Sequence, residues 1–256
     1  MPTYIQANGQ VSKSTTSAYG TGVAIVLANM GSLYAIGDII VVTTLTNFVD
    51  TNTVTDSAGN TYTKVSTQSV FTSFNFDIFY TVATAYTAPN FINWIANSNE
   101  AVGKTYNVGV YVIRPDSGTT FSSTGALFSS ATGSGTTPSI TTASLSANQV
   151  LIGTVCINGP NGDTWTEDND TLNGTWSSGQ GATGPSISAG TTGAGAASNY
   201  SIRSQYKLIT SSGAQTFNPT LGSSRSYGVN YVAITQTGTP TYTPNNPMGM
   251  MGFFGT

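Results

Sequence analysis

The chain has 256 residues, only 7% of which are charged, and seven Lys and Arg against ten Asp and Glu leave a formal net charge of −3. Because a typical soluble domain is about one quarter charged, hydroxyl, amide and backbone groups must supply most of the polar surface. The sequence has no basic stripe, which argues against nucleic-acid binding. No apolar run approaches the roughly 20 residues of a membrane-spanning helix, so we expect no membrane partner.

The order of elements along the chain predicts an all-β protein. Residues 1–21 are polar and without a period, which predicts an extended N-terminal arm. From residue 22 onward, short apolar or alternating runs are separated by Gly, Asn, Asp, Ser and Pro. No window keeps a helical period, so we expect almost no helix. The predicted strands are 22–28, 38–46, 76–84, 91–97, 106–114, 139–145, 149–157, 202–210, 214–221 and 227–235.

The predicted strands fall into two similar sets, which indicates a weak internal duplication. GDIIVVTTLT resembles NQVLIGTVCI, FDIFYTVATA resembles SIRSQYKLIT, FINWIANS resembles TFNPTLGS, and YNVGVYVI resembles YGVNYVAI. The halves are 22–115 and 136–237, and residues 115–135 cross between them. Since four or five strands are too few to bury two faces alone, we predict one domain, 22–237. It would be an antiparallel β-sandwich, jelly-roll or immunoglobulin-like, with a shared core.

Residues 238–256 form a separate C-terminal tail in which prolines disfavour a helix. Apolar side chains near a chain end are unfavourable in water unless they are covered. We therefore predict a strap that docks on its own subunit or on a neighbour, with a disordered tail as the alternative. The predicted partner-binding residues are Met248, Met250, Met251, Phe253 and Phe254.

Catalytic signatures are missing from the sequence. The chain has no His, which removes Ser-His and Cys-His nucleophiles and the commonest zinc ligand. It also contains no G-x-S-x-G elbow, P-loop or dinucleotide fingerprint. The single Cys156 lies in the apolar run VLIGTVCI, which predicts a small buried side chain. We expect neither an enzyme nor a cofactor.

The segment GDTWTEDNDTLNGTW, residues 162–176, concentrates acids and tryptophans within the long loop 158–199. A loop of this length is usually functional, mobile or held by a partner. Clustered carboxylates can bind Ca²⁺, although the spacing departs from the EF-hand pattern. Tryptophans beside polar residues can stack on sugar rings, and a solvated surface loop is the third interpretation. The calcium candidates are Asp163, Glu167, Asp168 and Asp170, and the glycan candidates are Trp165 and Trp176.

The stretch VTDSAGNTYTKV, residues 54–65, has two interpretations, a metal or sugar site at Asp56 and Asn60 or a tight turn. An Asp at the start of a turn accepts backbone N–H bonds, and Gly59 or Asn60 tolerates a positive φ. The alternation that follows favours a strand. We therefore predict a β-hairpin.

Four stretches together resemble a family of β-sandwich domains from phage genomes and bacterial surface proteins. They are GDIIVV, VTDSAGNTYTKV, TTPSITTASLSANQVLIG and the closing YGVNYVAIT. The resemblance covers roughly residues 20–237. It implies a jelly-roll or immunoglobulin-like sandwich in a virion or extracellular assembly, and it carries over no functional residues.

The leading functional expectation is a structural virion protein of a bacteriophage, as a capsid decoration or cement protein acting by adhesion between subunits. Its partners would be copies of itself and other virion subunits such as the major capsid protein. Its place would be the virion, extracellular after assembly in the host cytoplasm. One alternative is a tail or fibre module that contacts a host surface glycan through the 158–199 loop. Another is an extracellular filament subunit.

Overall fold

The computed structural model describes residues 3–14, 24–31, 34–47, 53–71, 73–95, 105–158, 165–178 and 200–238. In these ranges the protein is all-β with antiparallel sheets and no helix, so the predicted fold class is confirmed. In the same ranges, no helix has the length and apolarity needed to cross a membrane.

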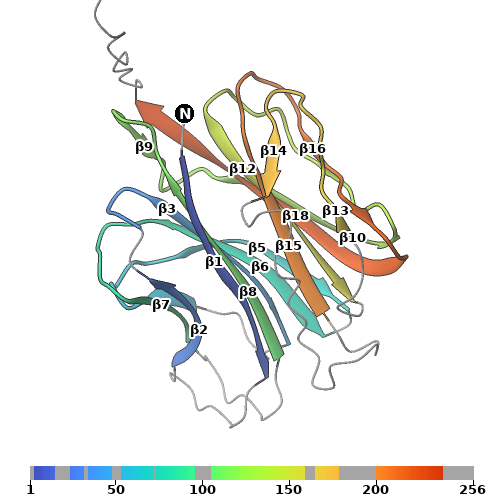
Figure 1. Ribbon diagram of the computed structural model, residues 1–256, viewed down its shortest axis with the longest axis horizontal. Helices are drawn as coiled ribbons and strands as arrows, with labels where there is room; N and C mark the ends of the chain where they lie inside the picture. The colour runs from blue at the N-terminus through green and yellow to red at the C-terminus, as the bar shows by residue number, and fades with distance from the viewer. Residues whose placement is uncertain are drawn as a thin grey trace, which may run out of the picture.

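A five-stranded sheet and a six-stranded sheet form the body of the molecule (Figure 1). The first has the order β1 (Thr3–Ser14), β8 (Thr105–Arg114), β3 (Ile39–Thr46), β6 (Phe74–Val82) and β5 (Thr63–Val70). The second has the order β10 (Leu127–Gly135), β18 (Arg225–Gly238), β12 (Gln149–Asn158), β15 (Tyr200–Leu208) and β14 (Trp176–Ser178). The short β9 (Thr119–Phe121) pairs with the end of β18.

Three smaller sheets complete the fold. The first half contains β2 (Ala24–Gly31), β7 (Asn90–Ile95) and β4 (Thr53–Asp56) in that order. The second half contains the pairs β11 (Ile140–Thr141) with β16 (Thr216–Phe217), and β13 (Trp165–Thr166) with β17 (Thr220–Leu221). In Figure 1 the small strands lie on the two outer sides of the large sheets, with β2 and β7 on one side and β13 and β16 on the other.

The two large sheets repeat one topology, as the internal duplication predicts. The order β8-β3-β6-β5 in one sheet corresponds to β18-β12-β15-β14 in the other. The repetition extends to hydrogen bonds at the start of the central strands. Gly37 donates its N–H to the Ala83 carbonyl at 2.8 Å, and Asn148 donates to the Ile209 carbonyl at the same distance. Both donors have a positive φ, 94° and 67° respectively.

The large sheets pack face to face, and each is covered on its other face by the small strands of its own half. Alternate residues of β3 therefore face different cores. Ile40 and Val42 pack in a cluster with Trp94 of β7, whereas Ile39 and Val41 pack in a cluster with Val150, Ile152 and other residues of the second half. All eight residues of β3 are buried, which explains why its sequence is continuously rather than alternately apolar.

Each half has a core of its own in addition to the shared one. The sequence predicts that each half is too thin to bury two faces alone. That prediction did not include the small outer sheets, which cover the second face of each large sheet. In the second half the Phe217 ring lies directly over Gly153, where an added Cβ would be 2.5 Å from a ring atom. The glycine in the middle of an apolar strand is therefore a packing site for an aromatic ring.

Two segments differ from the sequence-based expectation. Residues 3–14, expected within a polar arm over 1–21, form the edge strand β1 and pair antiparallel with β8 of the same subunit. The predicted crossover, residues 115–135, contains β9 and β10. Both segments are polar, and their strand structure comes from backbone pairing to β8 and β18 rather than from an apolar pattern of their own.

Candidate functional site

Asp56 is the centre of a buried hydrogen-bond network at the end of β4, with only 6% of its surface exposed. Its Oδ1 accepts the Asn60 backbone N–H at 2.9 Å. Its Oδ2 accepts bonds from the Asn60 side-chain amide, the Tyr62 hydroxyl and the Asn90 side-chain amide at 2.8–3.1 Å. Four donors therefore converge on one carboxylate, which leaves it little capacity for a metal ion or substrate.

Asn60 extends this network to the segment that follows β6. Its side-chain oxygen accepts the backbone N–H groups of Thr84 and Ala85 at 2.8 and 3.0 Å, and its amide also donates to the Ala85 carbonyl. Asp56 and Asn60 together therefore join the β4 turn to the β6–β7 connection. The turn interpretation of VTDSAGNTYTKV accounts for these contacts.

The turn is not a simple hairpin, which corrects the prediction. Gly59 has a φ of 84°, as expected, and Thr55 makes an isolated antiparallel bridge with Thr61. After that bridge the strands separate, because β4 pairs with β7 in the small sheet while β5 pairs with β6 in the large one. The chain thus crosses between layers here, and the Asp56 network holds the crossing.

Tyr62 makes this network sensitive to alkaline pH. Burial, with the nearby Asp56 charge and hydrogen bond as further causes, raises the pKa of Tyr62 well above its ordinary value of 10.0. A group whose folded pKa is raised stabilises the fold fully below its unfolded pKa, and this stability is lost as pH rises above it. We expect the free energy of unfolding to fall above pH 10, and to fall less steeply with pH in Tyr62→Phe than in the unchanged protein. Urea denaturation at several pH values measures this, and parallel slopes for the two proteins would contradict it.

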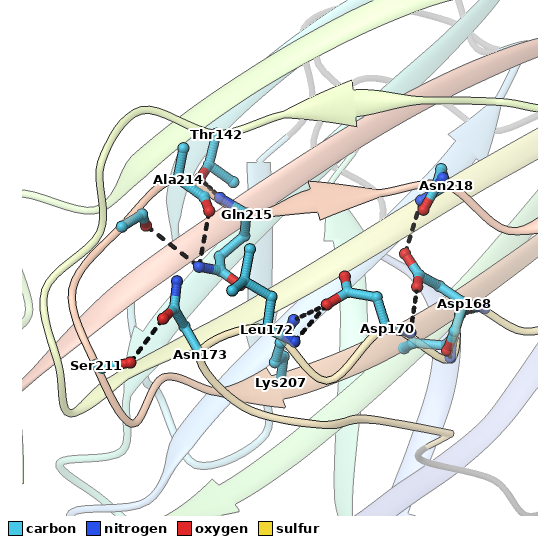
Figure 2. A network of polar contacts seen from close by, with 12 residues as sticks. Thr142, Asp168, Asp170, Leu172, Asn173, Lys207, Ser211, Ala214, Gln215 and Asn218 are labelled. Atoms are coloured by element: carbon cyan, nitrogen blue, oxygen red, sulfur yellow. Dashed lines mark hydrogen bonds and ion pairs between the residues drawn. The ribbon is translucent and has the colours of Figure 1, made fainter.

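The acidic segment 165–178 is the second copy of this turn. Asp168 is buried, and its carboxylate accepts the backbone N–H groups of Asp170 at 3.0 Å and Asn218 at 2.8 Å. Asn218 precedes β17, as Asn90 begins β7 in the first half. Gln205 of β15 makes two further 2.9 Å bonds to the Asp168 backbone. Figure 2 shows the contact of Asp168 with Asn218 and the neighbouring Asp170.

An ion pair between a buried lysine and a partly exposed aspartate lies beside this turn. The Lys207 side chain of β15 is 0% exposed, and its ammonium lies 3.1 Å from Asp170 Oδ1, whose side chain is 37% exposed. The ammonium also lies 5.3 Å from the centre of the Trp176 ring, within the range of a cation–π contact. Asp170 Oδ1 accepts the Leu172 backbone N–H at 2.7 Å. The pair therefore joins the turn to the large sheet.

The four calcium candidates do not gather around a common point in the part of the chain that is described. Asp163 lies outside the described residues. The Glu167 charge acts on Arg203: burial lowers the pKa of Arg203, and the nearby Glu167 charge offsets part of that lowering. Asp168 and Asp170 use their oxygens on the donors above. Over the described residues, no group of three His, Cys, Asp or Glu is placed to hold a metal ion.

The two tryptophans do not form an exposed pair, which corrects the expected glycan contact at Trp176. Its side chain is buried in the core of the second half, and its ring centre lies 5.0 Å from that of Phe217. Trp165 is partly buried, with the Arg203 guanidinium 5.5 Å from its ring centre. The tail residues Met248, Met250, Met251, Phe253 and Phe254 lie outside the described residues, as does most of the 158–199 loop.

Cys156 is buried, as its apolar surroundings predict. Burial raises the pKa of its thiol, so the reactive thiolate form is disfavoured.

The edge strand β10 is one surface that the sequence analysis missed. Its nine residues, LFSSATGSG, carry no charge and pair with β18 without a register shift. Leu127 and Phe128 are 38% and 53% exposed. The signal for it in the sequence is weak, because a stretch of Ser, Thr and Gly is typical of a loop.

A second missed feature is a groove at one end of the interface between the large sheets, which we call the sheet-end groove. Its volume is about 590 Å³. The lining residues come from the ends of β5 and β12, from β10 and from the start of β18: Ser69, Val70, Phe71, Thr132, Gly133, Ser134, Asn158, Ser226 and Tyr227. No sequence motif connects these residues, because only the packing of two sheets brings them together.

The fold defines an all-β protein of two similar halves, with buried polar networks that hold its turns. No family model matches the chain, and neither does any curated protein or solved structure at a significant level.

Proposed function

We propose that this protein is a structural, non-catalytic building block of a bacteriophage virion, a capsid decoration or cement protein that acts by adhesion between subunits. The observation that carries the adhesive role is the β10 edge. A strand at the edge of a sheet offers unpaired backbone groups to another chain, and proteins usually blunt such edges with bulges, lysines, prolines or short strands.

The other three edges of the large sheets carry such devices, and β10 does not. Strand β1 has two register shifts relative to β8, and β14 is only three residues long. Strand β5 has a register shift next to Lys64. Against these, β10 is regular and uncharged, and it begins with two exposed apolar residues, Leu127 and Phe128. This contrast supports the proposal that β10 is a surface on which another chain binds.

The partner we propose for β10 is the same strand of a second copy. Two antiparallel β10 strands would join the second sheets of two subunits through a two-fold axis, so that each exposed Phe128 is covered by the other subunit. A two-fold contact needs only one self-complementary patch, and the low charge of the chain leaves little repulsion between copies. The virion setting rests on the sequence resemblance and on this adhesive character.

Light scattering on the full chain tests the adhesive role. We expect an oligomer for the unchanged protein and a monomer for the double variant Phe128→Lys/Ser129→Lys, because two ammonium groups on each edge repel the partner and require water. Leu172→Lys is the matched control, since Leu172 is 65% exposed at another site. It should leave the mass unchanged.

Three outcomes would count against parts of this proposal. A monomeric full chain would contradict self-association. If the β10 double variant remains an oligomer, but a chain ended at Gly238 is a monomer, adhesion belongs to the C-terminal tail. Open-ended polymers would favour the filament role. Mass spectrometry of purified phage particles tests the virion setting, which fails if the protein is absent from them.

A further inference from the structure

We propose that the sheet-end groove binds a neutral saccharide. This role goes beyond adhesion between subunits. The groove takes residues from both large sheets, including Thr132, Gly133 and Ser134 of β10, whereas the proposed contact uses the outer backbone groups of β10. The groove is also a different site from the glycan contact that the sequence predicted at Trp165 and Trp176.

The groove exists because small residues occupy the inner face of the second sheet at this end. Beside them Gly228 lets β18 and β5 approach closely, since an added Cβ would lie 2.7 Å from a methyl of the lining residue Val70 and 3.0 Å from the Cys156 sulfur. The corresponding residue of the first half is Asn107, which is buried and donates to the Tyr200 carbonyl at 3.3 Å. The first half therefore fills this position with its own side chain, whereas in the second half Val70 and Cys156 pack closely around the glycine.

The lining is chemically suited to a ligand rich in hydroxyl groups. Among the lining residues, Ser69, Thr132, Ser134 and Ser226 carry hydroxyls and none carries a charge. Hydroxyls both donate and accept hydrogen bonds, so they match the same groups on a sugar. The buried Oδ1 of Asn158 has no hydrogen-bond partner within the described residues. Because an unpaired buried acceptor is costly, a ligand hydroxyl at this point would be favourable.

Two partly buried aromatic residues, Phe71 and Tyr227, contribute the apolar part of the lining. Tyr227 lies across the strand pair from Gly133, with its ring against the core of the second half and its hydroxyl in the space where a Cβ at 133 would be. Phe71 holds the backbone in the left-handed region, with a φ of 51°, and its ring centre lies 5.4 Å from that of Tyr200. A positive φ is strained for a large aromatic residue, and such strain concentrates at ligand sites.

The size and charge of the groove narrow the ligand class. A volume of about 590 Å³ lies within the range of small-molecule sites and accommodates one or two sugar units. An anionic sugar would meet no cation among the lining residues, and a peptide would need a deeper apolar pocket for an anchoring side chain. A neutral mono- or disaccharide is the class that these residues fit.

Nuclear magnetic resonance titration of the full-length protein tests the proposal, with maltose, lactose and N,N′-diacetylchitobiose as the probes and glucuronic acid as the charged comparison. We expect at least one neutral disaccharide to cause saturable shifts at the Gly133, Ser134 and Ser226 amides. Glucuronic acid should cause none. Ser226→Trp fills the groove from β18 and should weaken binding at least about tenfold.

Ser69→Trp fills the same groove from the opposite sheet, so a folding defect in one variant does not decide the result. Ser212→Trp is the matched control, an exposed serine in the turn after β15, and it should bind as the unchanged protein does. The proposal is overturned if no neutral probe shifts these amides. It is equally overturned if both groove-filling variants bind normally, or if glucuronic acid binds as tightly as the disaccharides.

Discussion

Replacing Asp56 by Ala is expected to cost about 3–5 kcal/mol of unfolding free energy. The substitution leaves the Asn60, Tyr62 and Asn90 donors in a buried space without their acceptor. Each stranded buried donor costs about 1–3 kcal/mol, although some of the four can relax or recruit water. The effect is large because one carboxylate serves four donors and holds the crossing between two sheets.

Urea denaturation followed by tryptophan fluorescence measures this effect, because Trp94 is fully buried in the core of the same half. Asp56→Asn tests whether the loss of an acceptor is the cause. It preserves the shape of the side chain but places an amide donor against other donors, so it should also be destabilising. Asp116→Ala is the control, at a carboxylate that accepts a 3.3 Å bond from Gln236, and it should cost less than about 1 kcal/mol. Unchanged stability of both Asp56 variants would contradict a structural role for the network.

Replacing Asp170 by Ala is expected to cost about 2–4 kcal/mol, because it leaves the buried Lys207 ammonium without its counter-ion. Removing one partner of a fully buried pair costs about 3–5 kcal/mol, and the lower range here reflects the partial exposure of Asp170. The two partners are therefore unequal. Lys207→Met should be nearly neutral, because methionine fills the space beside Trp176 while Asp170 remains partly in water.

The double variant Asp170→Ala/Lys207→Met distinguishes a stranded charge from a general loss of packing. Removing the buried charge should restore most of the stability that Asp170→Ala loses, again measured by urea denaturation. A double variant as unstable as Asp170→Ala alone would show that the carboxylate matters through the Leu172 bond rather than through Lys207.

Local patterns carried most of the strand prediction. Continuous apolar runs such as 38–46 and 149–157 recur as β3 and β12, and the paired runs occupy matching places in two sheets. Edge strands and polar strands were harder to predict from the sequence. Strands β1 and β10 have little apolar pattern, because their positions depend on backbone pairing to β8 and β18.

The candidate sites also depend on contacts between residues that are far apart in the sequence. The acids of 162–176 looked like ligands because a sequence shows which carboxylates are close along the chain but not which donors face them. In the fold Asp168 meets a backbone N–H 50 residues away and Asp170 meets a lysine 37 residues away. Trp176 looked available to a sugar for the same reason, although its ring belongs to the core.

The all-β class, the two similar halves and the turn at Asp56 follow from the sequence alone, because strand periodicity and turn chemistry act between near neighbours. Three features needed the folded structure: each half has its own outer sheet, β10 is an edge strand without a blunting device, and a groove opens between the ends of β5, β10 and β18. Those features depend on which faces meet and which backbone groups stay unpaired, and residues far apart in the chain set both.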